Sequence, residues 1–236
     1  MKFRCERDAL VEQLGTASRA VSSRGGALPV LTGIHLKAHE DVLTMTGSDL
    51  EITVKASVSV AVSEPGEAVL PSRIAVDIIR SLDSGAIEVE VNGEEAKISG
   101  GRSQFSVRTL PVDDFPTLTD PSGDEVTVAT SDLAAGLKQV VRAASGDDAR
   151  PILTGVLMSA EDGGLRLVAT DSYRLAVRDL PEATVLSEGQ KVLVPSRALD
   201  ELGRVLGDSE EVTVRLGERE VSFDVVVDDG EVQVTT

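Results

Sequence analysis

The chain has 236 residues, of which 41% are hydrophobic and 27% charged, and its net charge at pH 7 is −17. These proportions are typical of a globular protein, and no apolar run approaches the roughly 18 residues that a membrane-spanning helix needs. Taken alone, so negative a charge argues against a nucleic-acid partner, because phosphate binding needs a basic surface.

The first ten residues and the single cysteine bear on the compartment. The segment MKFRCERDAL has charges where a signal peptide has its apolar stretch, and Cys5 has no second cysteine with which to form a disulfide. We therefore expect a cytoplasmic protein without a membrane segment. We also expect Cys5 to be a buried or half-buried strand residue.

Residues 1–120 are expected to form a first domain. Spacings of three and four between apolar residues predict two helices, one from Arg7 or Asp8 to about residue 21 and one over 72–82. We expect the second helix to bury Ile74, Ile78 and Leu82. Strand-forming segments are found at residues 2–7, 30–38, 42–47, 51–62, 86–92, 95–99 and 103–108. Residues 111–122, rich in Pro and Asp, indicate a connector.

Residues 121–236 are expected to form a second domain of the same kind. Ser131 is suited to cap a helix over 131–145, and a further helix is predicted over 196–206. The buried face of the first of these helices is predicted to contain Leu133, Leu137, Val140 and Val141. Besides a hairpin that turns at 161–164, strands are predicted at 124–129, 173–180, 191–194, 210–216, 219–226 and 231–235.

The two domains are copies of one design. LPVLTGIHL, from Leu28, corresponds to RPILTGVLM, from Arg150, and LPSR at 70–73 corresponds to VPSR at 194–197. Asp49 aligns with Asp171, and both are predicted to cap a turn with the side chain. Several matches in the same order indicate a duplication, with two helices and about eight short antiparallel strands in each copy. The fold class is therefore predicted to be α+β.

The four predicted helices are less acidic than the rest of the chain. Their seven basic residues are Arg19, Arg73, Arg80, Lys138, Arg142, Arg197 and Arg204. Their six acidic residues leave a net charge of +1, against −17 for the whole chain. A mildly basic face suits loose, sequence-independent contact with phosphates. Solubility alone, or the preference of cations for the last helical turn, explains the same pattern, so both alternatives stay open on charge.

The ordered motifs resemble one known family. The start MKFRCERDAL, the two repeated segments, GSDLE, LPSR, GRSQFSVRTLPVDDFP and ATDSYRLAV together resemble the bacterial DNA polymerase III beta subunits, the sliding clamps. The resemblance covers the whole chain. It implies tandem clamp domains with helices inside and sheets outside. In that family, three such domains per chain form a head-to-tail dimeric ring around duplex DNA, which tethers the polymerase without chemistry of its own.

The resemblance implies a role for the basic helices. They would line the hole and face double-stranded DNA, together with Arg24 and Arg150 on neighbouring loops. A ring that slides needs weak and non-specific contacts, which a modest positive charge supplies, whereas an acidic exterior would keep DNA away from the outside. The resemblance therefore favours the interpretation that the helices contact DNA, at the nucleoid, over the interpretation that they serve solubility.

The resemblance also implies two protein-binding regions. A pocket for short peptide motifs of the polymerase III catalytic subunit, the clamp loader and repair proteins would use Leu153, Thr170, Ser172, Tyr173, Arg174 and Leu175. Many relatives have Gly-His in place of Ser172-Tyr173. The dimer edge would include Arg102, Gln104 and Val107, on a strand that is also a candidate for self-association. The third domain, which supplies the other pocket wall and the partner face, is expected to be absent.

Two other classes of function were considered. An enzyme would need a catalytic constellation, but there is no Gly-rich phosphate loop or nucleophile elbow. His35 and His39 alternate with Lys37 on one predicted strand face, which we expect to be solvated, and no cysteine or carboxylate cluster accompanies them. We therefore expect no catalytic residue, metal or cofactor. The remaining alternative is an interaction scaffold of tandem clamp-like domains without direct DNA contact.

Overall fold

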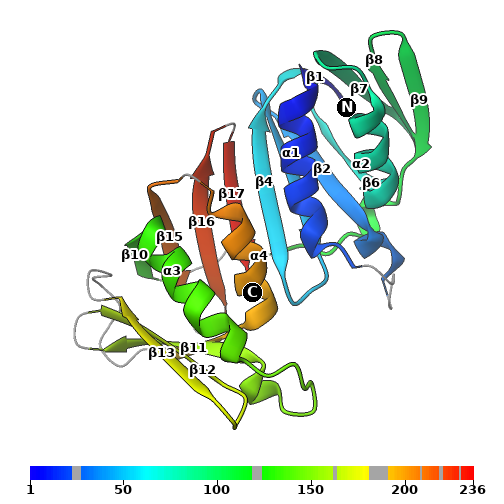
Figure 1. Cartoon of the computed structure of the whole chain (residues 1–236). Coiled ribbons are helices and arrows are strands. Elements are labelled where there is room, and N and C mark those ends of the chain that lie inside the picture. The colour runs from blue at the N-terminus through cyan, green and yellow to red at the C-terminus, as the bar shows by residue number, and fades with distance from the viewer. Residues whose placement is uncertain are drawn as a thin grey trace. The chain divides into compact units, whose positions relative to one another are not determined.

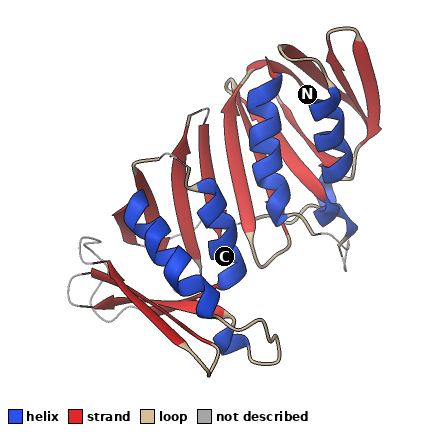
Figure 2. Ribbon diagram, viewed as in Figure 1, coloured by secondary structure: helices blue, strands red, loops and turns tan. Residues whose placement is uncertain are grey.

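The structure is a computed structural model that describes residues 1–22, 28–118, 124–161, 164–180, 191–207, 209–217, 220–228 and 230–236. The chain divides into two compact units, Met1–Leu118 with Asp228–Val232, and Thr119–Val227 with Gln233–Thr236. In each unit, helices cover antiparallel sheets (Figures 1 and 2). The predicted α+β class is confirmed. None of the helices in the described ranges is long and apolar enough to cross a membrane.

The first unit has two α-helices, α1 (Arg7–Ala17) and α2 (Ser72–Ser81). Its strands are β1 (Lys2–Glu6), β2 (Gly33–His39), β3 (Val42–Ser48), β4 (Thr53–Ser59), β5 (Ala61–Glu64), β6 (Gly66–Pro71), β7 (Ala86–Asn92), β8 (Glu95–Gly100) and β9 (Ser103–Arg108). One sheet has the order β5-β1-β7-β8-β9, and in the other β4, β3, β2 and β6 are neighbours. Each of these pairs is antiparallel.

The prediction of one strand over 51–62 is wrong, because the chain changes sheets near Val60. The β4 strand pairs with β3, whereas β5 pairs with β1 in the other sheet. Asp41 fixes the crossing point: its carbonyl oxygen accepts a hydrogen bond from Val60 N at 2.8 Å, and its side chain accepts one from Val62 N at 3.0 Å. Alternation along the sequence does not reveal such a crossing, since both strands keep the same period.

The predicted buried face of α2 is also partly wrong. Leu82 is buried as expected, but Ile78 is only half-buried and Ile74 is 51% exposed. The face toward the sheets is formed instead by Ala75, Val76 and Ile79, with Ser72. The reason lies in how the helix begins. Strand β6 pairs with β2 as far as Pro71, and the chain passes directly from β6 into α2. The strand therefore sets the rotation of α2 about its own axis.

The second unit repeats the design with α3 (Thr130–Val140) and α4 (Ser196–Val205). Its strands are β10 (Asp124–Ala129), β11 (Gly155–Glu161), β12 (Gly164–Thr170), β13 (Leu175–Leu180), β14 (Lys191–Pro195), β15 (Glu211–Leu216), β16 (Val221–Val227) and β17 (Gly230–Thr235). One sheet has the order β13-β12-β11-β14, and β10, β15, β16 and β17 are neighbours in the other.

The core of the second unit confirms the predicted face of α3. Leu133, Leu137, Val140 and Val141 are all buried. Ser131 is not the N-cap, however, because the helix already begins at Thr130, immediately after the last residue of β10. The Thr130 N–H donates to the carbonyl oxygen of Glu210 at 3.0 Å, so the end of the sheet takes the place of a side-chain cap.

Candidate functional site

The loop between β12 and β13 is held by the side chain of Asp171. One oxygen of this carboxylate accepts the backbone N–H groups of Tyr173 and Arg174, each at 3.0 Å. The other oxygen accepts Nε of Arg174 at 3.0 Å. The N–H groups of Arg174 and Tyr173 lower the pKa of Asp171, because they favour the charged carboxylate. The predicted capped turn is therefore present.

The first unit contains the same turn. Asp49 Oδ1 accepts the backbone N–H groups of Glu51 at 3.1 Å and Ile52 at 2.9 Å. The next residue has a positive φ in both units, 75° at Leu50 and 79° at Ser172. Since the turn is present in both copies, Asp171 has a structural role that does not depend on what the loop binds.

The structure brings most of the predicted pocket residues together in this one loop. Thr170 Oγ1 donates to the Arg174 carbonyl at 2.7 Å and accepts the Ser172 N–H at 3.1 Å. The ring of Tyr173 and the side chain of Leu175 are left 95% and 66% exposed. An apolar group and an aromatic ring held out by a fixed turn can contact a ligand without first having to leave a core.

Leu153 lies in a neighbouring segment that Arg150 links to the loop. A 3-10 turn at Pro151–Leu153 precedes β11, and Leu153 N donates to the Arg150 carbonyl at 2.9 Å. Arg150 Nη1 donates to Ser172 Oγ at 3.4 Å, while its Nε pairs with Asp147 at 2.9 Å and lowers the pKa of that carboxylate. Arg150, expected among the DNA-binding residues, thus lies beside the predicted peptide loop.

An apolar row that was not predicted from the sequence lies on the same sheet. Leu157 of β11 is paired with Leu193 of β14 on one side and with Val168 of β12 on the other, and Val168 is paired with Val177 of β13. Val177 and Leu193 are 51% and 41% exposed, and Ile152 in the preceding 3-10 turn is 75% exposed. Apolar residues at both alternating positions of β11 and β12 are the signal that could have indicated this row.

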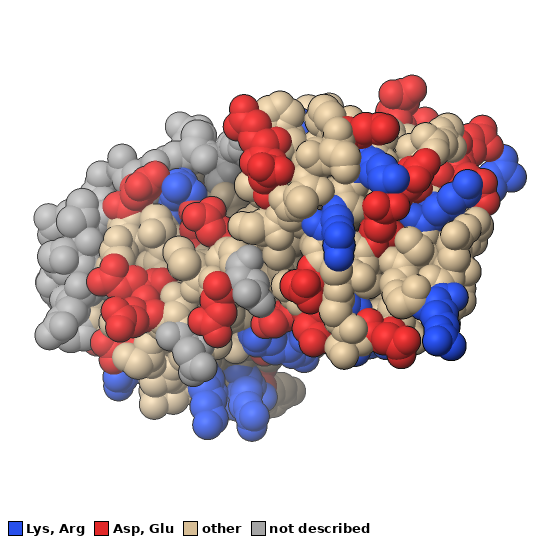
Figure 3. Space-filling model, turned by 90° about the horizontal axis from the view of Figure 1, so that it is seen from above, with Lys and Arg blue, Asp and Glu red and all other residues tan. Residues whose placement is uncertain are grey.

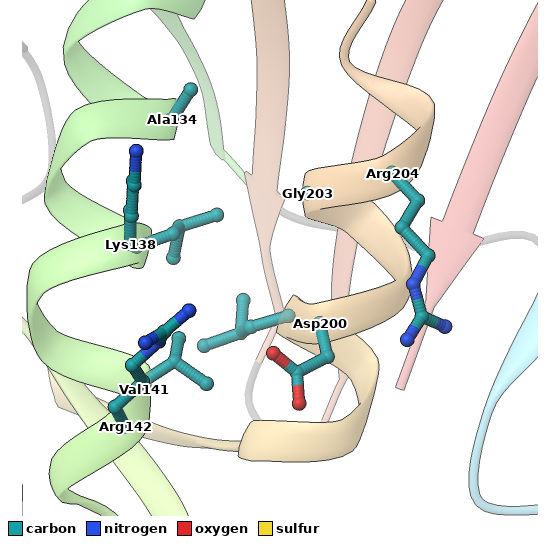
Figure 4. A pocket seen from close by; sticks show the side chains of 9 residues that line it. Ala134, Lys138, Val141, Arg142, Asp200, Gly203 and Arg204 are labelled. Carbon is teal, nitrogen blue, oxygen red and sulfur yellow. The ribbon is translucent and has the colours of Figure 1, made fainter.

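Basic residues of α3 and α4 line a groove of about 370 Å³ in the second unit. Lys138 and Arg142 come from the α3 side, and Arg204 and Asp200 come from α4 (Figure 4). The apolar lining consists of Ala134, Leu137, Val141 and Leu199. Arg204 pairs with Glu201 at 2.5 Å, whereas no ion pair links Lys138 or Arg142 to another described residue. The groove therefore presents basic groups that can contact an anion.

The basic residues of the first unit also lie on helix surfaces. Arg19, Arg73 and Arg80 are exposed, and a guanidinium nitrogen of Arg80 lies 3.7 Å from where a Cβ on Gly15 of α1 would be. Because α1 begins at Arg7, the helices contain one more cation than the sequence analysis counted, and it pairs with Asp8 at 3.2 Å. The predicted DNA-binding residue Arg24 lies outside the described residues. In the second unit, Arg197 is exposed on α4.

Acidic side chains are present on the face of the molecule shown in Figure 3. Asp and Glu are scattered over the face shown in Figure 3, as expected from the negative charge of the chain outside the helices. The predicted dimer edge lies on β9, the last strand of its sheet. Arg102 and Gln104 are exposed there, whereas the side chain of Val107 is buried.

The histidines and the cysteine do not form a reactive cluster among the described residues. Within the described ranges, no group of three His, Cys, Asp or Glu side chains could hold a metal ion. Cys5 is buried on β1, as predicted, and burial raises its pKa to about 12. The predicted solvated face is exposed at Lys37 and His39, but His35 is half-buried and stacks on Phe115 with the ring centroids 5.1 Å apart. Burial lowers the pKa of His35.

Comparison with known proteins gives the same answer for both units. Residues 1–119 match the N-terminal domain of the DNA polymerase III beta subunit, and residues 127–235 match the central domain. The beta sliding clamp of Streptomyces coelicolor is 35% identical over 219 residues, which cover 92% of this chain and 57% of that protein. The chain thus spans less than two thirds of the length of this relative.

Solved structures agree with the sequence comparison. The sliding clamp of Bacillus subtilis has a TM-score of 0.91 at 31% identity. A sliding clamp of Pseudomonas aeruginosa bound to griselimycin has a TM-score of 0.91 at 32% identity. Each match covers 100% of this chain and 64% of the other. Matches of this extent in sequence and structure, through two consecutive domains, show that this chain belongs to the DNA polymerase III beta subunit family.

Proposed function

We propose that the chain supplies the first two domains of a DNA sliding clamp, a non-catalytic factor that encircles duplex DNA and tethers the replicative polymerase. The two units would be clamp domains over residues 1–120 and 121–236. A third domain would be needed to close a ring of two chains, with the β9 edge around Arg102, Gln104 and Val107 as one face of the joint. The open side of β9 supports this role, because an edge strand offers unpaired backbone groups.

The observation that carries the DNA part of the proposal is the placement of basic side chains on helices. In the second unit, Lys138 and Arg142 face a groove between α3 and α4, in a chain that is otherwise strongly acidic. A small number of cations among apolar neighbours binds phosphates only weakly, and weak binding allows a ring to move along DNA. Arg19, Arg73, Arg80, Arg197 and Arg204, and the loop residue Arg150, would contribute in the same way.

The loop at 170–175 supports a second part of the proposal, the docking of partner peptides. Tyr173 and Leu175 are held exposed by the Asp171 turn, and Arg150, just before Ile152 and Leu153, donates to Ser172 of the same loop. Partners would be the polymerase III catalytic subunit, the clamp loader and other proteins with an apolar clamp-binding segment. Peptides that bury aromatic and branched side chains in such a site gain most of their affinity from a few residues.

A titration of the chain with a short DNA duplex at low salt tests the DNA part. Backbone amide NMR shifts are expected to change along α3 and α4, around Lys138 and Arg142, with affinity that falls steeply as salt rises. Glu at both positions is expected to abolish these changes. The matched control is Lys37→Glu with Lys97→Glu, two substitutions on strands that change the net charge by the same amount. This control is expected to bind the duplex as the unmodified chain does.

A contrary outcome would favour the scaffold function. If the duplex changed no signals on the helices, or if reversal of charge on the helices and on the strands had equal effects, the DNA part would be wrong. The same helix variants in a version with a third domain are expected to lose retention on circular DNA after loading. A scaffold without DNA contact would retain its peptide binding and show no such loss.

A further inference from the structure

The duplication places the same surface at the same point in both units. A 3-10 turn at Pro29–Thr32 precedes β2, as the turn at Pro151–Leu153 precedes β11. In the first unit, the threonine hydroxyl of this turn donates to the Pro29 carbonyl at 2.7 Å, and in the second unit the equivalent hydroxyl donates to the Pro151 carbonyl at 2.9 Å. Val30 and Leu31 therefore correspond to Ile152 and Leu153.

Strand register extends the correspondence. Gly33 is paired with Pro71 and Gly155 with Pro195 at the start of the two sheets. Two residues further along, His35 is paired with Val69, and Leu157 is paired with Leu193. Val30, Leu31 and Val69 in the first unit are thus the structural equivalents of Ile152, Leu153 and Leu193 in the second. We refer to these two sets of three residues as the first and the second docking surface.

The two docking surfaces differ sharply in exposure. Val30, Leu31 and Val69 are 4%, 5% and 0% exposed. In the second docking surface, Ile152 is 75% and Leu193 is 41% exposed, and Leu153 is half-buried. Because local geometry and register are the same, the difference must come from what covers each surface.

Residues 109–118, which overlap the predicted connector at 111–122 and are called the connector from here on, cover the first docking surface. Leu110, Val112 and Phe115 pack against Val30, Leu31 and Val69. The Leu110 N–H donates to the Val69 carbonyl at 2.8 Å, and a 3-10 turn at Val112–Asp114 then brings the ring of Phe115 onto His35.

Two equivalent glycines show the difference directly. A Cβ on Gly33 would lie 2.5 Å from Val69 of the same sheet and 2.9 Å from a methyl group of Leu110, whereas the three atoms nearest to a Cβ on Gly155 all belong to Leu193 and Val194. The connector thus supplies one of the nearest contacts at Gly33, whereas the nearest contacts at Gly155 come from β14.

The composition of the connector defines what such a surface accepts. In LPVDDF, the half-buried residues are Leu110, Val112 and Phe115, and the exposed ones include Asp113 and Asp114. The covering segment is therefore a short acidic peptide with three apolar anchors, first in a β-bridge and then in one tight turn. Next to the second docking surface, Arg150 precedes Ile152 by two residues and donates to Ser172 Oγ at 3.4 Å, while its Nε pairs with Asp147.

We propose that the first unit carries a second copy of the peptide-docking site, closed in cis by the connector. The inference rests on the peptide-docking part of the proposed function and extends it to the first unit. When Leu110 and Phe115 no longer cover it, the first docking surface accepts in trans a peptide with the pattern of the connector. A molecule of this design has two equivalent docking surfaces, of which one is open and one is occupied by its own chain.

The test uses a fluorescent peptide with the sequence of residues 108–118 and the full 236-residue chain. Leu193→Glu first blocks the second docking surface. Adding Leu110→Ser and Phe115→Ser then opens the first docking surface. We expect the peptide to bind this opened chain about tenfold more tightly than it binds the Leu193→Glu chain, because two apolar side chains of the peptide can then be buried. Val30→Glu in the opened chain is expected to remove this gain. A peptide with Ser at its three anchors is the matched control.

The proposal is overturned if the opened chain, melting cooperatively, binds no more tightly than the Leu193→Glu chain, or if Val30→Glu leaves the gain intact. Phe115→Ala alone, which retains the Leu110 anchor, replaces the double substitution if that variant does not fold, and is expected to give a smaller gain of the same sign. Failure of the docking part of the proposed function would be seen separately, in a version with the third domain that supplies the other pocket wall. If that version bound the peptide no more tightly than its Leu193→Glu variant does, the docking part would be wrong.

Discussion

Replacing Gly47 with Ala tests how closely α1 approaches the sheet of the first unit. Gly47 lies on β3, and a Cβ there would lie 2.0 Å from the carbonyl oxygen of Ala17 and 3.0 Å from a methyl group of Val21. Ordinary contacts begin near 3.4 Å, so the end of α1 would have to move by roughly 1.4 Å. The blocking atom belongs to the backbone, and no rotamer change can relieve the clash.

We expect this substitution to lower the free energy of unfolding by about 3 kcal/mol, the upper end of the usual cost of overpacking. In a unit of this size, that corresponds to a fall of about 12 °C in the melting temperature of the first unit. Calorimetry of the full chain measures it. The end of α1 leads into the segment with Arg19, so amide shifts at that residue should change as well.

Gly203→Ala is the matched control, because a Cβ on this α4 residue meets nothing within 4 Å. Alanine is favoured over glycine in helices by about 1 kcal/mol, so a small increase in stability is expected. If Gly47→Ala cost less than about 1 kcal/mol, the close approach of α1 to β3 would be wrong.

Three further outcomes are expected. Burial lowers the pKa of His35, against the raising effect of Glu67 and with Lys37 nearby, so the folded state disfavours its protonation. The free energy of unfolding should then fall as pH drops below about 6.5, by at most about 1.4 kcal/mol per pH unit. Urea titrations at several pH values measure this slope, and His35→Leu, which introduces the residue found at the equivalent position, Leu157, should flatten it. An unchanged slope would show that other groups cause the pH dependence. Cys5, with its pKa raised to about 12, should react with a thiol reagent at pH 8 only after unfolding, and labelling as fast as in urea would contradict its burial. Asp171→Ala should speed trypsin cleavage after Arg174 several-fold, because two backbone N–H groups lose their acceptor. The equivalent Asp49→Ala should leave that cleavage unchanged, and equal effects of the two variants would show that the turns are not independent.

Local chemistry was predictable from the sequence wherever neighbouring residues decide the structure. The Asp49 and Asp171 turns follow from a side chain that bonds to the backbone two and three residues later. The buried face of α3 follows from the spacing of Leu133, Leu137 and Val140.

Features that depend on distant partners were not predictable in this way. The rotation of α2, which leaves Ile74 exposed, is set by strand pairing at Pro71. The half-burial of His35 requires Phe115, which lies 80 residues further along the chain. Likewise, alternation of apolar residues in β11 and β14 does not reveal that Leu193 stays 41% exposed whereas the connector buries Val69.

The left-handed backbone at Ser172 has a consequence for binding. Ser172 has a φ of 79°, in a region that glycine adopts freely but that costs other residues steric energy. With positive φ, a serine has far fewer allowed backbone conformations than a glycine has. The Asp171 carboxylate and the Thr170 hydroxyl restrict the loop further. A ligand that meets Tyr173 and Leu175 would therefore lose little conformational entropy in ordering them. Ser172→Gly would keep the side chains of Tyr173 and Leu175, remove the hydrogen bond from Arg150 to Ser172 Oγ, and weaken binding through the flexibility of the free loop.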